Sequence, residues 1–566
     1  NDRTWKHVPR VRIPPSPPQR NMFKKNTLKN KNISIPFFLI IFLLGILLFK
    51  DYGVSLDERF HRNNALFWHD YIESLFNDNV SLKSKQSINL IDEAIKNNED
   101  FISGVPSIQP VPLAIIYEFF LDLTNIESSK EIYQYRHFYN FIIYFFGLFF
   151  FYKLIQKIYK SHFLALIGSL FLFLTPRLFS ESFYNPQDIF FLSLTIINMY
   201  TGITFLKKPS IKRALFFSLS SGLCIDTRIM GFISFFIVLL FFIIKMLRSK
   251  RYTQDNLKFF IYIIPFTFFI IIIFWPFLWA SPLKNLYFAA SELSSVKFIV
   301  TNFYFGQYIS SIAVPWHYHL IWIGITSPII VITLFFIGVF FIFRRIFIRI
   351  MKLNDNLNDI WRGDKEMSNI FFLVLIILPI YLFIDQGLGY SGWRHLYFIY
   401  PSIIMIALFA IYHFSLSIKN NFFHLLIYTL ISLNLIYLGY WIYKNHPYQY
   451  VYFNLFSKDK IDLFDKDYWG LSNKNSLEYI IKNSENFPSK IATKSFASLE
   501  KSLLVFTEEQ RSKVEIVYDY EKADFIITNY SKRLRNEFIV DKNKYQKYYE
   551  ILVDGHPINT VYSKKN

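Results

Sequence analysis

The feature that most constrains this chain of 566 residues is a series of apolar runs of membrane-spanning length. A lipid bilayer offers backbone groups no hydrogen-bond partners, so such runs cross it as helices. The sequence therefore predicts an all-α polytopic membrane domain with about eleven transmembrane helices. The runs cover approximately 35–49, 138–152, 163–179, 189–205, 214–225, 229–246, 259–275, 320–343, 370–384, 396–411 and 422–443.

The net charge of +19 is distributed in a way that argues against nucleic acid as a partner. Loops on one side of the predicted membrane contain 23 lysines and arginines, and the short loops on the other side contain five. This asymmetry predicts a cytosolic N-terminus and a C-terminal domain on the other side of the membrane. We expect a multi-pass protein of the cytoplasmic (inner) membrane, in contact with membrane lipids, with the C-terminal domain periplasmic or extracellular. The single cysteine, Cys224, lies in an apolar run, which excludes a disulfide framework.

Three parts follow from this pattern. Residues 1–33 form a disordered or artefactual N-terminus and cytosolic segment, with Met22 as the expected natural start. Residues 34–443 form the transmembrane domain, with a large first outer loop at 50–136. Residues 444–566 form a soluble outer α/β domain, in which Asp554-Gly555 separates two strands of a predicted hairpin. Further short strands are expected at 491–496, 514–518 and 525–528, and a helix at 476–482.

The sequence Ser55-Leu56-Asp57-Glu58 opens a predicted interfacial helix directly after the first span. Two explanations compete for its carboxylates. Ser55 and Glu58 have the spacing of a capping box, and Asp57 is favoured near a helix N-terminus. Alternatively, Asp57 is a catalytic base at the membrane surface, where it would activate an acceptor hydroxyl.

A second group of polar residues marks the outer ends of other spans. Asn185-Pro186-Gln187-Asp188 has the composition of a helix start, but it also places a second carboxylate at the membrane face of Asp57. Arg228 and Arg394 are explained by ion pairing or snorkelling, or by a bidentate grip on a phosphate. The other candidates at this face are Arg136, His137, Asp385 (expected to pair with Arg394) and His395.

Two further aromatic motifs have simple explanations. Pro315-Trp316-His317-Tyr318-His319 has neither the cysteines nor the spacing of a common zinc site. His446 and Tyr448, after the last span, fit an interfacial belt, or a surface on which a sugar or a polyprenyl chain stacks.

The order of these motifs resembles that of the GT-C membrane glycosyltransferases, in the branch of protein O-mannosyltransferases and aminoarabinose transferases. An Asp-Glu pair opens the large outer loop, and Asn185-Pro186-Gln187-Asp188 opens the fourth span. Further motifs that look like signatures of bacterial members are Arg136-His137, Gly392-Trp393-Arg394-His395, His446-Pro447-Tyr448-Gln449-Tyr450, Tyr452-Phe453-Asn454 and Asp467-Tyr468-Trp469-Gly470.

The resemblance implies a GT-C-like fold and the inverting transfer of a sugar from a polyprenyl-phosphate donor to a hydroxyl of a glycan, lipid or protein. It implies Asp57 as base, Glu58 as its support or an acceptor ligand, and Asp188 as the second acidic residue. Arg228 and Arg394 would hold the donor phosphate. No cofactor is firmly implied, and dependence on a divalent metal stays open.

Two rival functions remain. A polymerase or ligase that uses a diphosphate-linked lipid would be expected to carry an arginine-rich outer loop. A transporter or scaffold would be expected to place ionisable groups at mid-membrane, whereas the acidic candidates here lie at span ends.

Overall fold

The computed structural model describes residues 31–76, 108–248, 254–294, 299–351, 364–418, 420–493, 495–531 and 540–565. The expectations for residues 1–30, including the start at Met22, lie outside this part of the chain. All eleven predicted spans fall on helices within it. The helices that contain them are α1 (Lys31–Leu48), α5 (Ser129–Tyr159), α6 (His162–Phe173), α7 (Pro176–Tyr184), α8 (Pro186–Lys207), α9 (Ile211–Thr227), α10 (Gly231–Arg248), α11 (Gln254–Phe274), α13 (Tyr318–Thr326), α14 (Ile329–Met351), α15 (Asp364–Gln386), α16 (Tyr400–Ser417) and α17 (Asn421–Lys444).

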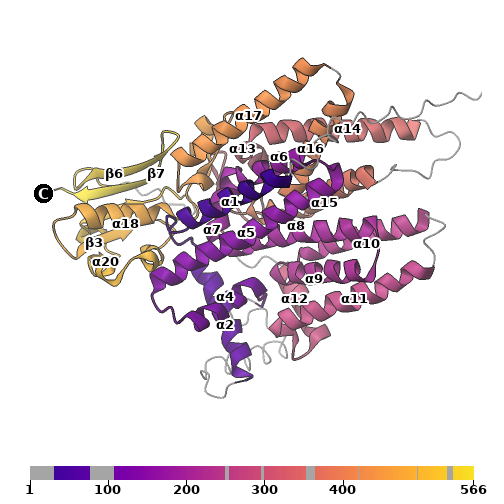
Figure 1. Ribbon diagram of the computed structural model, residues 1–566. Coiled ribbons are helices and arrows are strands. Elements are labelled where there is room, and N and C mark those ends of the chain that lie inside the picture. The colour runs from indigo at the N-terminus through magenta and orange to yellow at the C-terminus, as the bar shows by residue number, and fades with distance from the viewer. Residues whose placement is uncertain are drawn as a thin grey trace, which may run out of the picture.

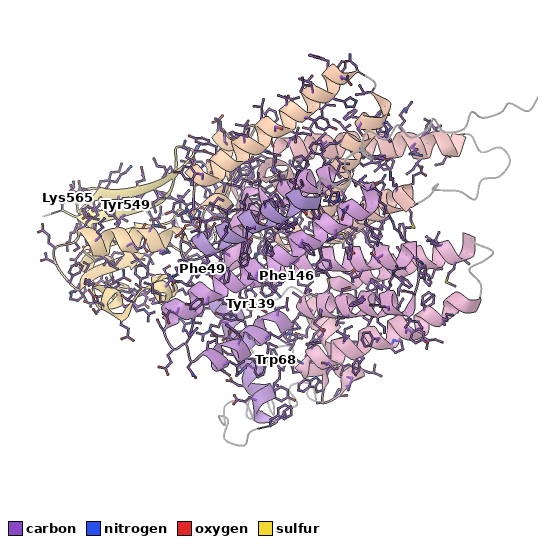
Figure 2. The ribbon with its side chains drawn as sticks, viewed as in Figure 1. Phe49, Trp68, Tyr139, Phe146, Tyr549 and Lys565 are labelled. Carbon is purple, nitrogen blue, oxygen red and sulfur yellow. The ribbon has the colours of Figure 1, made fainter. Side chains whose placement is uncertain are left out.

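The prediction of a polytopic helical membrane domain is confirmed, but the eleven segments are not equally long. Among the described residues, seven helices are long and apolar enough to cross a membrane, or eight if the bent pair α6 and α7 is one span. Two shorter apolar helices cover Ile33–Leu48 and Gly231–Leu247. Aromatic side chains occupy much of the bundle, for example Tyr139 and Phe146 along α5 (Figure 2).

Two predicted spans are interrupted by proline. The span predicted at 163–179 bends by 68° between α6 and α7, where Pro176 starts the second helix. The span predicted at 320–343 is divided at Pro328 between α13 and α14. Proline lacks the N–H that continues a helix and restricts the residue before it, so an apolar run can continue through the break while the helix does not.

The first outer loop contributes two packed helices, α2 (Glu58–Ser74) and α4 (Pro112–Thr124). The predicted helix after Asp57 is therefore confirmed. Its Trp68 is buried, whereas Phe60 is exposed on the same helix. The loop between α11 and α13 forms α12 (Pro282–Ser294) and a hairpin that the sequence did not suggest, β1 (Thr301–Tyr304) with β2 (Gln307–Ser310).

The C-terminal α/β domain is confirmed. Its five-stranded sheet has the order β4-β3-β5-β7-β6. The strands are β3 (Ser489–Thr493), β4 (Val514–Ile516), β5 (Phe525–Thr528), β6 (Tyr545–Val553) and β7 (His556–Lys564), and α18 (Ser472–Asn483) packs on the last two. Asp554 and Gly555 both have positive φ and join the antiparallel β6 and β7, as an Asp-Gly turn requires.

The C-terminal domain lies at one end of the helix bundle, beside the start of α5 (Figure 1). The Ser129 hydroxyl, at the start of α5, donates to the Leu504 carbonyl over 2.9 Å. Lys474 on α18 donates to the carbonyls of Lys50 and Asp51, just after α1. The helix ends that adjoin the predicted cytosolic loops of α10, α11 and α14 lie at the opposite end of the bundle (Figure 1).

The pH dependence of stability tests the packing of the C-terminal domain. Burial raises the pKa of Asp467 to about 6, although the Tyr450 and Ser472 hydroxyls and the Gly470 N–H all donate to it. The folded state therefore keeps a proton that the unfolded state releases near pH 4. We expect stability to fall as the pH rises from about 4 to about 6, by up to about 3 kcal/mol from this group.

Thermal unfolding in detergent across this pH range measures the effect. Asp467→Asn should remove this component of the pH dependence while leaving the other titrating groups unchanged. The same slope in wild type and variant would contradict the prediction.

Candidate active site

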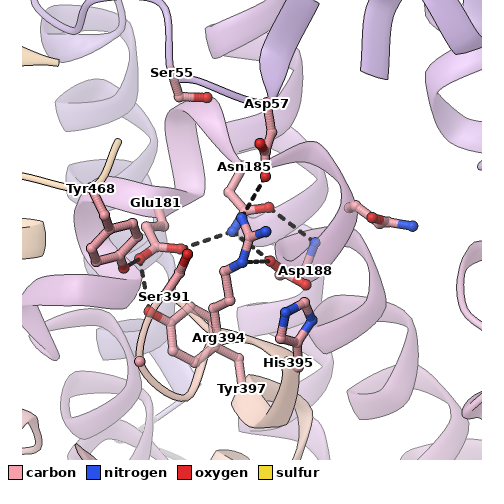
Figure 3. A network of polar contacts seen from close by, with 12 residues as sticks. Ser55, Asp57, Glu181, Asn185, Asp188, Ser391, Arg394, His395, Tyr397 and Tyr468 are labelled. Carbon is pink, nitrogen blue, oxygen red and sulfur yellow. Dashed lines mark hydrogen bonds and ion pairs between the residues drawn. The ribbon is translucent and has the colours of Figure 1, made fainter. Parts of the chain in front are cut away.

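The guanidinium of Arg394 lies between two carboxylates from distant parts of the chain (Figure 3). Its Nη1 donates to Asp57 Oδ2 over 2.6 Å, and its Nε lies 3.9 Å from Asp188 Oδ2. Arg228 forms a second ion pair with Asp188. Four residues predicted from separate motifs therefore meet at the start of α2, the start of α8, the end of α9 and the start of the 3-10 helix η2 (Arg394–Ile399).

Asp57 occupies the N-cap position of α2, but its side chain makes no capping hydrogen bond. Its side chain is 30% exposed, whereas that of Asp188 is 3% exposed. Of the two carboxylates, Asp57 is the one that an incoming group can reach. The backbone before it is held by the C-terminal domain, because Leu56 N donates to the Trp469 carbonyl and Lys501 donates to the Leu56 carbonyl.

Asp188 lies in the capped first turn of α8 and also contacts both arginines of the cluster. The Asn185 side chain accepts a hydrogen bond from Asp188 N over 3.1 Å, as an N-cap does, with Pro186 in the first turn of α8. The Asn185 amide also donates to Asp188 Oδ2 over 2.9 Å. The cap therefore orients the carboxylate that the two arginines contact.

A buried polar network that the sequence did not indicate continues from Asn185. Its amide donates to Glu181 on α7, whose other carboxylate oxygen accepts from the Tyr397 and Tyr468 hydroxyls over 2.7 and 3.1 Å. Glu181 is fully buried. Because its partners lie in three separate segments, no spacing in the sequence could have identified it.

Aromatic rings and a constrained loop fix Arg394. The centre of its guanidinium lies 5.0 Å from the Tyr390 ring and 4.7 Å from the Trp469 ring. Gly392, two residues before it, has φ of +72°, which favours glycine. Asn302 on β1 donates to the Gly389 carbonyl and accepts from Ser391 N, so the unpredicted hairpin holds the loop.

A cavity of about 450 Å³ opens beside this cluster. Arg228, His395 and Gln187 contribute polar groups to its wall. Most of the remaining wall is apolar and includes Phe60, Ile229, Met230, Ile233, Leu382, Phe383 and Leu388.

Among the described residues, the buried nitrogens without a hydrogen-bond partner include Arg228 Nε, Arg394 Nε and His395 Nε2, of which Arg394 Nε lies 3.9 Å from Asp188 Oδ2. His395 Nδ1 lies 3.2 Å from Arg228 Nη1, a donor, so Nδ1 accepts and Nε2 carries the proton. All three atoms are therefore donors. Buried donors without partners carry a free-energy cost, which an anion at this place would remove.

His61 lies one helical turn after Asp57. Desolvation lowers its pKa to about 4, against the attraction of the nearby Asp57 carboxylate. It is therefore neutral near pH 7 and adds no positive charge to the cluster.

Several predicted site residues lie outside the cluster. Glu58 is fully buried, where it accepts from Ser55 N over 2.7 Å and contacts His137 Nε2 at 3.0 Å. The Glu58 half of the predicted capping box is therefore present, while the Ser55 hydroxyl donates to the Tyr184 carbonyl instead. Arg136 pairs with Glu118 over 2.7 Å.

The predicted pairing of Asp385 with Arg394 is wrong. Arg394 pairs with Asp57 and Asp188, and among the described residues no ion pair includes Asp385, which is exposed at the end of α15. His446 contacts Asp51 at 2.8 Å, and neither it nor Tyr448 lines the cavity.

Within the described part of the chain, neither Asp57 nor Asp188 belongs to a group of three metal-ligating side chains, and each of the two carboxylates is paired with an arginine. His317 Nδ1 contacts the Tyr304 hydroxyl, whereas His319 Nε2 donates to the Leu388 carbonyl.

No protein-family model and no curated protein matches this chain. Among solved structures it is similar to ArnT from Cupriavidus metallidurans bound to undecaprenyl phosphate, with 9% identity, a TM-score of 0.39, and coverage of 93% of this chain and 97% of that one. For the apo state of ArnT the values are 10%, 0.41, 94% and 98%. Identities of 9–10% with TM-scores below 0.5 do not by themselves establish a common fold or activity.

The buried position of Glu58 predicts a structural contribution. Glu58→Ala would leave His137 and Ser55 N without their buried partner, so we expect a loss of about 2–3 kcal/mol in unfolding free energy. The exposed neighbour provides the control: Arg59→Ala should stay within about 0.5 kcal/mol of wild type. Unfolding in detergent measures both, and equal stability of the two variants would contradict the assignment.

Proposed function

We propose that this protein is a membrane glycosyltransferase that moves a sugar from a polyprenyl-phosphate donor to a hydroxyl acceptor, with inversion. One observation carries the proposal. A reachable carboxylate, Asp57, pairs with Arg394, and Arg394 shares Asp188 with Arg228. Arg228 and His395 in turn contribute polar groups to the wall of a largely apolar cavity.

The charges of the cluster favour a phosphate as the group that binds there. Two guanidinium groups already balance Asp57 and Asp188, so an added anion needs donors that these pairs do not use. Among the described residues, Arg228 Nε and His395 Nε2 are such donors. Arginine is well suited to this task because its planar fork matches phosphate oxygens.

The apolar part of the cavity favours a donor with a lipid tail. Ile229 and Met230 directly precede α10 and Ile233 lies in its first turn, while Leu382 and Phe383 lie near the end of α15. Both helices belong to the apolar bundle. A polyprenyl chain would leave this wall toward the membrane while its phosphate stays at the arginines.

In the proposed step Asp57 accepts the proton of the acceptor hydroxyl as its oxygen bonds to the anomeric carbon of the sugar. The bond between that carbon and the phosphate oxygen breaks, and its electron pair goes to the phosphate. Negative charge then accumulates on the phosphate, where Arg228 and Arg394 oppose it. Attack opposite the leaving phosphate inverts the anomeric carbon.

The proposed location follows the charge asymmetry of the loops. The reaction takes place at the outer face of the cytoplasmic membrane, on the side of the C-terminal domain. That domain contributes Trp469 and Lys501 near Asp57, so it is placed to contact the acceptor, whether glycan, lipid or protein.

The direct test of the base is sugar transfer by the purified protein in lipid nanodiscs, with radiolabelled polyprenyl-phosphate sugars as donors. Asp57→Asn keeps the side-chain size but cannot accept the proton, so we expect turnover to fall by about 10²–10⁴-fold. Asp51→Asn is the matched control, since Asp51 is a nearby outer carboxylate that pairs with His446, away from the cavity. Its turnover should equal that of wild type.

Full activity of Asp57→Asn would overturn the assignment of the base and direct attention to Asp188. Wild-type protein that transfers no sugar from any monophosphate donor, but acts on a diphosphate-linked lipid, would overturn the donor class. Inactivity with both would favour a transporter or scaffold.

The phosphate site has its own test. Arg228→Gln should lower kcat/KM for the donor by about 10–100-fold, because it removes a charge-assisted contact to the phosphate. The control is Arg345→Gln, which breaks the ion pair between Arg345 on α14 and Glu366 on α15. It should leave kcat/KM unchanged. Equal effects of the two substitutions would mean that Arg228 does not contact the donor.

A further inference from the structure

A second cluster of titratable side chains lies between α2 and α4. His69 and Glu73 are one turn apart on α2 and therefore share a face, and Asp122 on α4 completes the group. One ligand atom from each of the three lies within 4.8 Å of the others. Within the described residues this is the one such group of histidine and carboxylate ligands.

The contacts of His69 point to a cation. The side chain is 5% exposed, and its Nδ1 lies 3.0 Å from Asp70 Oδ1. Because a carboxylate only accepts, Nδ1 carries the proton of this hydrogen bond. In the neutral ring Nε2 then has its lone pair, and it lies 2.7 Å from Asp122 Oδ2.

Among the described residues the buried Nε2 has no partner that meets hydrogen-bond geometry, although the facing Asp122 carboxylate contributes to the raised pKa of His69. A lone pair and a carboxylate oxygen at this distance repel each other unless a positive charge lies between or beside them. A metal ion held by both atoms would supply that charge.

We propose that His69, Glu73 and Asp122 bind one divalent transition metal, with zinc as the preferred ion. Imidazole nitrogen with two carboxylates is a common zinc donor set and is disfavoured for magnesium or calcium. Asp70 acts behind His69 and fixes the ring through Nδ1, as carboxylates behind metal-binding histidines commonly do.

The ion would join α2 to α4 far from the reacting groups. His69 lies twelve residues after Asp57, about 18 Å along the helix axis. At the other end of the pair Arg62 contacts Glu118 at 3.5 Å, and beside His69 the Phe119 ring packs at 4.3 Å. A metal here would fix the helix that starts at Asp57, so it acts on the position of the site and not on its chemistry.

The rival explanation needs no metal. The hydrogen bond with Asp70 raises the pKa of His69, and an imidazolium between Asp70 and Asp122 would also relieve the repulsion. The two explanations differ in whether the chain takes up zinc.

The experiment is a titration of the full-length protein in detergent, after treatment with a chelator, with zinc chloride and a competing chromophoric chelator. It does not depend on sugar transfer, so its result is separable from that of the proposed function. We expect one zinc per chain, and an affinity at least 100-fold weaker in His69→Gln and in Asp122→Asn. Asp70→Asn, which removes only the supporting carboxylate, should weaken binding by about 10–100-fold.

Two features keep the outcome decisive. Asp122 is 62% exposed, so Asp122→Asn tests the site even if His69→Gln does not fold. His556→Gln is the matched control, because His556 also contacts a carboxylate, Asp462, at 2.7 Å, but belongs to no group of three ligands. No saturable zinc binding by wild type, or equal binding by Asp122→Asn, would overturn the proposal in favour of the imidazolium.

Discussion

The outer end of this bundle depends on the ion pairs that the Arg394 guanidinium forms with Asp57 and Asp188. Without this guanidinium, Arg228 would still pair with Asp188, but Asp57 would lose its ion pair. Two carboxylates near the membrane would then share the charge of one arginine. The pairing therefore requires α2, α8 and η2 to converge. Burial makes this requirement strict, since Arg394 is only 7% exposed and a buried charge that loses its partner costs several kcal/mol.

The C-terminal domain takes part in this arrangement directly. Trp469 covers the face of Arg394, and its carbonyl accepts from Leu56 N, one residue before Asp57. Tyr468 donates to Glu181, which is linked to Asp188 through Asn185. The segment that enters the α/β domain is thus part of the wall of the site. A change in the packing of this domain would move Asp57 and Arg394 together.

The sequence predicted local structure correctly where the contacts that determine it lie between neighbouring residues. The Asn185 cap, the Asp554-Gly555 turn and the helix after Asp57 depend on neighbours within four residues, and all three are present. Pairing over long distances was not predictable in this way. Asp385 is close to Arg394 in sequence but exposed, whereas the true partner Asp57 is 337 residues away. Glu181 and Asn302 could not be predicted, because the contacts that involve them in the site come from remote segments, Tyr397 for Glu181 and Gly389 for Asn302. Most of the difference in span count comes from helices α1, α9 and α10, which are too short to be counted, and the proline break between α6 and α7 accounts for one more span.

The balance of charge in the cluster bears on the proposed sugar transfer. In the free protein the two arginines are paired with the two carboxylates, so the cluster is close to neutral, while Arg228 Nε and His395 Nε2 have no hydrogen-bond partner among the described residues. The proposed phosphodiester donor would bring one negative charge, and its phosphate would gain a second as the sugar leaves. In the proposed reaction, Arg228, Arg394 and His395 would therefore oppose a charge that grows as the sugar leaves. Binding of this kind is stronger in the transition state than in the ground state, which is the condition for accelerating the chemical step. The apolar wall would strengthen this electrostatic stabilisation, because apolar side chains screen the charge of the arginines less than water does.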